Sequence, residues 1–135
     1  MSIRSVIALA VGIACVVAAV SAAAHHSFAA EFDANKKVTV TGTVTRIEWM
    51  NPHARFYVDV KDETGKVVNW DFELASPNGL MRRGWTRSSL KAGDVVTVVA
   101  YGAKNAPYVA NASSITMSDG RKMFAGSSFE NAQGQ

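Results

Sequence analysis

Three histidines are the residues of this sequence whose type and spacing point to a specific ligand. His25 and His26 are adjacent, whereas His53 stands alone in the corner Asn51-Pro52-His53. A histidine at a newly exposed N-terminus offers its α-amine and a ring nitrogen to one metal ion. A further histidine completes a nitrogen set that suits Cu(II). The sequence therefore predicts a copper site formed by His25, His26 and His53.

The ligand set of that site depends on where the chain is cleaved. Cleavage after Ala24 would leave His25 first, and its amine and imidazole would bind the metal with either His26 or His53. Cleavage after Ala23 would make His26 the third residue, so that the amine, two backbone amides and its imidazole form a square-planar clamp. The alternative is a soluble leader without a metal role, with His53 hydrogen-bonded to the backbone of its turn.

A second candidate site is the outward face of a β-hairpin expected at residues 54–74. It carries one arginine and one aromatic residue among carboxylates, a composition that does not fit single-stranded nucleic acid. This face is either solvated or binds a cationic or polar partner. Its candidate binding residues are Arg55, Tyr57, Asp71 and Glu73.

A third candidate is the arginine cluster, formed by Arg82, Arg83, Trp85 and Arg87. Guanidinium groups recognise carboxylate and phosphate, so this cluster can hold an anion, a lipid head group or an acidic partner protein. The alternative is that the arginines cover the domain at a helix end and pair with carboxylates of the hairpin, Asp71 or Glu73.

No arrangement typical of an enzyme is present in the sequence. Serines and threonines occur without a nucleophile elbow, and no histidine accompanies them in a known pattern. Asp71 and Glu73 share a strand face, but a domain this small has a filled interior and offers the pair no pocket. We therefore expect a non-catalytic binding protein, with copper as its candidate metal.

Residues 1–24 predict a secretory signal peptide. Arg4 supplies a positive start, residues 6–20 are apolar, and residues 21–24 are the small residues that precede a cleavage site. The apolar run is shorter than the roughly 20 residues of a spanning helix. We expect cleavage, no stable membrane anchor, and a periplasmic or secreted protein whose partner is a metal ion or another exported protein.

The remaining chain has a weak, mixed charge and no cysteine. Cys15, the single cysteine, leaves with the predicted signal peptide. Loss of Arg4 leaves 13 basic and 11 acidic residues, so the formal net charge is +2. That balance does not favour nucleic acid as a partner.

The longest β-signal runs from Val38 to Trp49. Its apolar residues alternate, but Val44 and Ile47 lie on opposite parities. A change of phase inside a strand indicates a bulge, which we predict at Thr45–Arg46. A long bent strand of this kind can pair with neighbours on both sides.

The later elements alternate with turn signals. We expect strands at 54–61 and 67–74, with Trp70 and Phe72 in the core. A short helix follows, capped by Ser76 with Pro77 in its first turn and ended by Gly84. Two strands, 95–101 and 109–117, and a short return at 121–124 complete the pattern.

Three strands, one helix and two strands are the order of an OB-fold, a five-stranded partly open barrel. An immunoglobulin-like sandwich needs about seven strands and no helix. We therefore expect an all-β domain at 37–125 with one short helix and an OB-fold-like barrel. A signal peptide at 1–24 and an N-terminal leader at 25–36 precede it. A disordered tail at 126–135 follows.

The chain after residue 24 resembles a family of small exported bacterial proteins of unknown function. The resemblance lies in the runs HHSFAAEFD (25–33), EWMNPHA (48–54), WDFEL (70–74), RRGWT (82–86) and LKAGD (90–94). It implies export and a small β-rich domain, and it implies no activity.

Overall fold

The computed structural model describes residue 5 and residues 28–126 of the 135-residue chain. The predicted cleavage site, both N-terminal histidines and nearly all of the predicted tail lie outside the described residues. Among the residues described, no helix has the length and apolar character needed to cross a membrane.

Strands make up most of the described chain, and only short helical segments accompany them. A helical turn at residues 28–31 comes first. The elements after it are β1 (Phe32–Glu48), β2 (Arg55–Lys61), β3 (Val67–Glu73), α2 (Pro77–Arg82), β4 (Val95–Ala103), β5 (Val109–Met117) and β6 (Lys122–Phe124). The hairpin, the helix and the two later strands lie where the sequence predicts them. The first strand begins earlier, at Phe32, so the second half of the predicted leader is strand.

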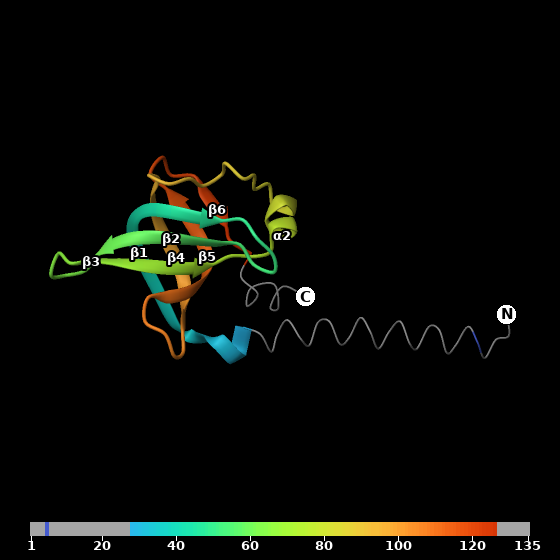
Figure 1. The fold of residues 1–135 in the computed structure, drawn as a ribbon, viewed down its shortest axis with the longest axis horizontal. Coiled ribbons are helices and arrows are strands. Elements are labelled where there is room, and N and C mark those ends of the chain that lie inside the picture. Colours follow the sequence, from blue (N-terminus) through green and yellow to red (C-terminus); the bar gives the residue numbers. More distant parts are fainter. Residues whose placement is uncertain (1–4, 6–27, 127–135) are drawn as a thin grey trace.

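Five of the strands close into a ring (Figure 1). The hydrogen-bonded order is β3-β2-β1-β4-β5-β6, and a parallel pairing of β3 with β5 joins the two ends of the ring. All other neighbours are antiparallel. Strand β6 pairs with β5 alone and lies outside the ring.

Strand β1 pairs on both sides because it changes register in the middle. Its first part pairs with β4 up to Thr43, and its second part pairs with β2 from Thr43 onward. The register shifts between Val44 and Arg46, which confirms the predicted bulge. Gly42 precedes it, and a Cβ there would lie 2.2 Å from the backbone oxygen of Asp59. Only glycine allows the two strands to approach this closely.

The core inside the ring is built on the alternation of the hairpin strands. Phe56 and Phe72 are fully buried and stack with ring centroids 5.1 Å apart. Trp70 stacks on Phe72 at 5.6 Å but is only half-buried, and it lies nearer than Phe72 to the turn at residues 62–66 that forms the tip of the hairpin. The prediction that Trp70 is a core residue is therefore correct for its direction and wrong for the extent of its burial.

Helix α2 begins and ends with the signals that the sequence contains. The hydroxyl of Ser76 accepts a hydrogen bond from the Gly79 amide over 3.2 Å, and Pro77 occupies the first turn. Gly84 adopts a φ of +85°, the left-handed conformation that stops a helix. Leu80 is fully buried and fixes the helix beside the ring.

Candidate functional site

His53 is held by the strand end that follows the hairpin. Its Nδ1 lies 3.0 Å from the carbonyl oxygen of Leu74 and 3.9 Å from Oε1 of Glu73. In the tautomer whose Nδ1–H donates to that carbonyl, Nε2 carries the lone pair. The side chain is 36% exposed, so the imidazole is partly accessible to a ligand. A backbone hydrogen bond at one ring nitrogen is also how metal-binding histidines are oriented.

Glu73 lies next to His53 and is buried, with 8% of its surface exposed. The hairpin face on which the sequence places it is therefore not solvated at this position. Residue 73 pairs with Asn111 of β5 in the parallel register, and β5 covers the end of β3. The ring closure thus converts an outward position into an interior one.

Two donors satisfy the Glu73 carboxylate. The side-chain amide of Asn111 donates to Oε1 over 3.0 Å, and Nη1 of Arg55 donates to Oε2 over 3.4 Å. Burial raises the pKa of Glu73, and the nearby Glu31 carboxylate raises it further. His53, Arg55 and the Asn111 amide oppose that rise in pKa. The charge of the Glu73 carboxylate therefore depends on these neighbouring groups.

We call Glu73, His53, Arg55 and Asn111 the Glu73 cluster. Asn111 is the member of this cluster that sequence reasoning missed. It is 1% exposed, and its Oδ1 has no hydrogen-bond partner among the described residues. The only signal in the sequence is an asparagine between the small residues Ala110 and Ala112 in an otherwise buried strand. Its pairing with Glu73 depends on a contact between strands that are distant in the chain.

The polar side chains of the hairpin face pair mostly with one another or with side chains of β1. Nε of Arg55 donates to Oδ1 of Asp71 over 2.9 Å, so Asp71 and Glu73 contact Arg55 and not the arginine cluster. The hydroxyl of Tyr57 donates to Glu48 over 3.1 Å, and the Arg46 guanidinium lies 4.1 Å from the centre of its ring. Few polar groups of this face are left for a partner.

The start of the described chain is fixed close to the Glu73 cluster. Phe28 and Phe32 are buried, and Phe28 packs edge-on against Tyr101 with centroids 5.8 Å apart. Tyr101 pairs with Asn111 across β4 and β5. Glu31, in the same helical turn as Phe28, is near enough to Glu73 to raise its pKa. The N-terminal segment therefore enters the fold on the side where Glu73 and His53 lie.

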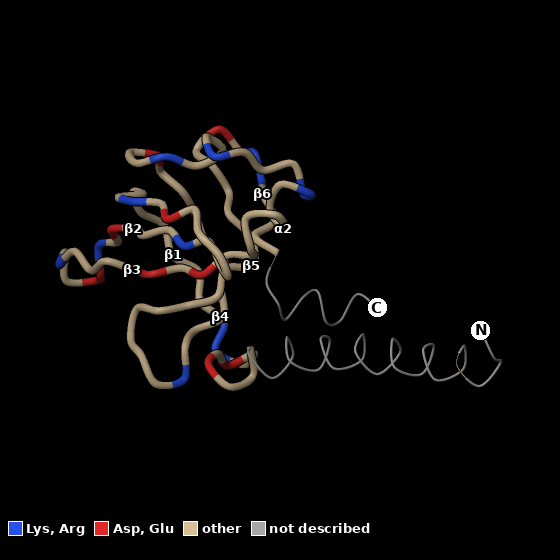
Figure 2. Tube along the Cα trace, turned by 45° about the vertical axis from the view of Figure 1, so that its right-hand side comes forward, with Lys and Arg blue, Asp and Glu red and all other residues tan. Residues whose placement is uncertain are grey.

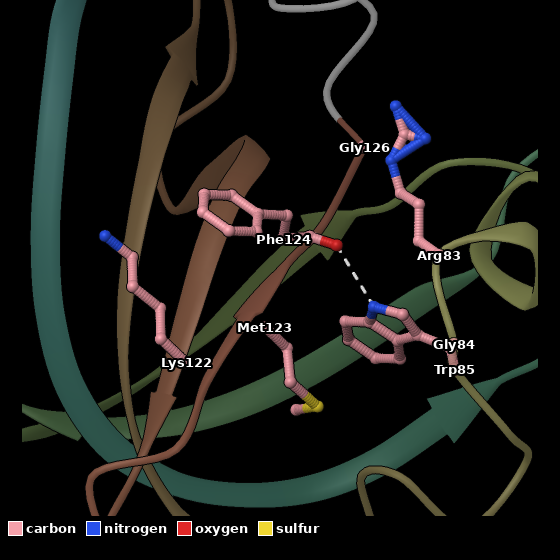
Figure 3. Close-up of a pocket in the computed structure, with 7 residues that line it drawn as sticks. All are labelled: Arg83, Gly84, Trp85, Lys122, Met123, Phe124 and Gly126. Carbon is pink, nitrogen blue, oxygen red and sulfur yellow. Dashed lines mark hydrogen bonds between the residues drawn. The ribbon is translucent and has the colours of Figure 1, made fainter.

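The arginine cluster does not form one surface. The Arg87 guanidinium lies 5.9 Å from the ring centre of Trp49, and Arg82 is exposed at the end of α2. Trp85 is buried and its Nε1 donates to the backbone oxygen of Phe124 over 3.0 Å. Arg83 alone of the three arginines lines a hollow beside the indole (Figure 3).

That hollow lies between the end of α2 and strand β6 and encloses about 530 Å³. Figure 3 shows Arg83 and Lys122 on opposite sides of it, with the indole of Trp85 directed at the Phe124 carbonyl. We call it the β6 hollow. Its lining residues are Arg83, Gly84, Trp85, Lys122, Met123, Phe124 and Gly126.

Of the predicted copper ligands, only His53 belongs to the described chain. Within residues 28–126, no group of three or more histidine, cysteine or acidic side chains gathers in a way that could hold a metal ion. A metal site with three such ligands would therefore need at least one from outside residues 28–126, and the sequence predicts His25 and His26.

The described residues define a small β protein with a ring of five strands, a buried polar cluster at its closure and a separate basic hollow. A family of unknown function (DUF6152) matches residues 13–110, which is most of the chain. The protein belongs to that family, which confirms the resemblance found in the sequence. No curated protein is significantly similar to this chain.

Proposed function

We propose that this protein is an exported, non-catalytic binding module that holds Cu(II) between its mature N-terminus and His53. The proposed architecture is an OB-fold-like barrel. The strand order, the helix between β3 and β4, and the parallel pairing of β3 with β5 support that architecture. The proposed location is the periplasm or the cell exterior, on the basis of residues 1–24.

The orientation of His53 is the observation that carries the copper proposal. Its Nδ1 is engaged by the Leu74 carbonyl, with the Glu73 carboxylate behind it. This arrangement fixes the ring and leaves Nε2 as the donor, as in metal sites where a second layer of hydrogen bonds orients each histidine. A single imidazole binds Cu(II) weakly, so further nitrogen ligands are required.

The N-terminal segment can supply those ligands. Phe28 anchors the chain on Tyr101, and the Glu31 carboxylate lies near enough to raise the pKa of Glu73, whose Oε1 is 3.9 Å from Nδ1 of His53. His26 is two residues before Phe28, a distance of at most about 7 Å along an extended chain. An α-amine with the imidazoles of His25 or His26 and of His53 forms a nitrogen set that favours Cu(II).

The proposal contains no catalytic step. The two acids that share a face of β3, Asp71 and Glu73, both contact Arg55. A carboxylate that neutralises a guanidinium is a poor general base, since proton uptake would leave the cation without its partner. The cluster is better suited to orienting His53 than to performing a reaction.

Titration of the exported, naturally processed protein with Cu(II), followed by calorimetry, tests the copper site. His53→Ala should weaken binding at least about tenfold, or about 1.4 kcal/mol. An extra residue before the mature N-terminus should also weaken binding, because it removes the α-amine from the site. Met50→Leu, at an exposed position of the same corner, is the matched control and should leave the affinity unchanged.

A peptide of residues 25–33 separates the proposed site from a generic copper-binding leader. The whole protein should bind Cu(II) more tightly than this peptide, because His53 contributes only when the fold is present. Equal affinities, together with an unaffected His53→Ala variant, would remove the copper proposal.

A metal-free interaction module is the second candidate function, and the β6 hollow favours it. The hollow combines two cations with exposed apolar surface, including Phe124 at 61% exposure. Apolar surface beside charge is typical of protein interaction sites. This function needs no residue of the copper site, so the two proposals are tested separately.

A further inference from the structure

The β6 hollow runs along a strand that has a neighbour on one side only. Strand β6 pairs with β5 and is the last strand of the sheet in residues 28–126. All three of its residues line the hollow. The open edge of the sheet and the hollow are therefore the same feature of the surface.

The hydrogen bonds of this pair show which backbone groups face outward. Met117 donates to the oxygen of Arg121, and Ala125 donates to the oxygen of Ser113. Antiparallel strands turn alternate residues toward and away from their neighbour. Lys122 and Phe124 therefore direct their N–H and C=O groups away from β5. The indole of Trp85 uses one of these groups, the Phe124 carbonyl.

Within residues 28–126, both backbone groups of Lys122 and the N–H of Phe124 are thus left on the outer edge without a strand partner. These groups are the donors and acceptors that an added strand requires. The Trp85 bond occupies one end of the edge, so an added segment would pair at Lys122 and direct every second side chain into the hollow. Unpaired edges of this kind template pairing with another chain.

The charge of the hollow identifies the partner. Arg83 and Lys122 line it, and no acidic residue of the described ranges is part of the lining. Asp119, in the turn before β6, is held by Arg121 over 2.7 Å. Figure 2 shows basic positions around α2 and β6 in excess over acidic ones. Carboxylates complement this surface, and Phe124, which is exposed, complements an apolar side chain.

We propose that the β6 hollow docks an extended segment of another protein that carries carboxylates and one large apolar side chain. The segment adds to the outer edge of β6, and its carboxylates pair with Arg83 and Lys122. This inference deepens the second candidate function and does not depend on the copper site.

Fluorescence anisotropy of a labelled peptide tests the docking site. The probe is acetyl-Gly-Glu-Ser-Phe-Ser-Glu-Gly-amide carrying fluorescein, in which both glutamates and the phenylalanine share one face of an extended strand. It is titrated with the purified protein in the presence of EDTA so that metal binding plays no part. We expect saturable binding with one peptide per protein. Arg83→Glu combined with Lys122→Glu should weaken it at least about tenfold, or about 1.4 kcal/mol.

Lys61→Glu with Lys66→Glu is the matched control. It makes the same change in net charge at the tip of the β2–β3 hairpin and should change the affinity less than about twofold. Lys122→Pro compared with Lys122→Ala tests the edge itself, because proline also removes the outward N–H. The N–H does not serve the β5 pairing, so circular dichroism should show both variants folded.

Four results would overturn the proposal. They are no saturable binding, equal losses in the two charge-reversed proteins, a proline variant that binds as well as the alanine variant, and a large gain in affinity on deletion of residues 127–135. The last result would identify the chain's own C-terminal segment as the occupant. None of these results bears on Cu(II) binding, so failure here leaves the copper proposal intact.

Discussion

The side-chain amide of Asn111 donates to Oε1 of Glu73 over 3.0 Å, and both residues are buried. Asn111 belongs to β5 and Glu73 to β3, and the two face each other in the parallel pairing that closes the ring. The bond therefore joins the two strands that close the ring. It also holds the carboxylate that lies behind His53.

Asn111→Ala should destabilise the protein by about 1–3 kcal/mol. The substitution leaves a buried carboxylate oxygen without its donor, and an unsatisfied buried polar group costs about this much. Urea unfolding followed by tryptophan fluorescence measures the change. Asn105→Ala, at an exposed position of the loop after β4, should cost less than about 0.5 kcal/mol. Equal effects would mean that the Asn111 bond contributes nothing to closure.

Glu73→Gln should change how stability depends on pH. Burial is the main cause that raises the folded-state pKa of Glu73 above its ordinary value of 4.5. Between these two pKa values the folded protein binds more protons than the unfolded chain. The contribution of Glu73 to stability is therefore present below the ordinary pKa and is lost as pH rises through the folded one.

Urea unfolding of metal-free protein from about pH 4 to pH 7 measures this contribution as the difference between wild type and Glu73→Gln. The stability of the wild type should fall relative to that of the variant as pH rises. A constant difference across the range would show that Glu73 has the same pKa in the folded and unfolded chain.

Phe72→Ala should cost about 3–5 kcal/mol, the usual range for truncation of a fully buried aromatic residue. Trp70→Ala should cost less, because Trp70 is half-buried. Asn69→Ala, on the other face of β3, should cost under about 0.5 kcal/mol. Chemical denaturation of the three variants gives the order, and an equal cost at positions 69 and 72 would contradict the strand phase.

Gly42→Ala should destabilise the protein by at least about 1–3 kcal/mol, the range found for overpacking. The added Cβ would lie 2.2 Å from the backbone oxygen of Asp59, and backbone cannot move aside as a flexible side chain can. Thr39→Ala, at an exposed position of the same strand, is the control. A thermal midpoint of Gly42→Ala equal to that of the control would show that β1 and β2 can separate without cost.

The signal-peptide prediction concerns residues 1–24, nearly all of which lie outside the described chain. The intact mass of the exported protein should correspond to a start at Ala24 or His25. A mass that retains residues 1–23, or one that includes a lipid on Cys15, would contradict it.

The local features of this fold follow from the sequence alone, because each depends on neighbouring residues. Alternation gives the faces of β2 and β3, a change of parity gives the bulge after Val44, and Ser76 and Gly84 mark the limits of α2. Side-chain period and turn chemistry act within a few residues, so these features could be predicted without the tertiary structure.

The candidate sites depended on the tertiary structure. Alternation assigns Glu73 to the outward face, and only the parallel pairing of β3 with β5 buries it against Asn111. Asp71 and Glu73 pair with Arg55. Trp85 is buried apart from the arginines and donates a hydrogen bond to the Phe124 carbonyl. These contacts join residues far apart in the chain, and no local pattern specifies them. The sequence therefore determined which side chains are available, and ring closure decided which are buried, paired or exposed to a ligand.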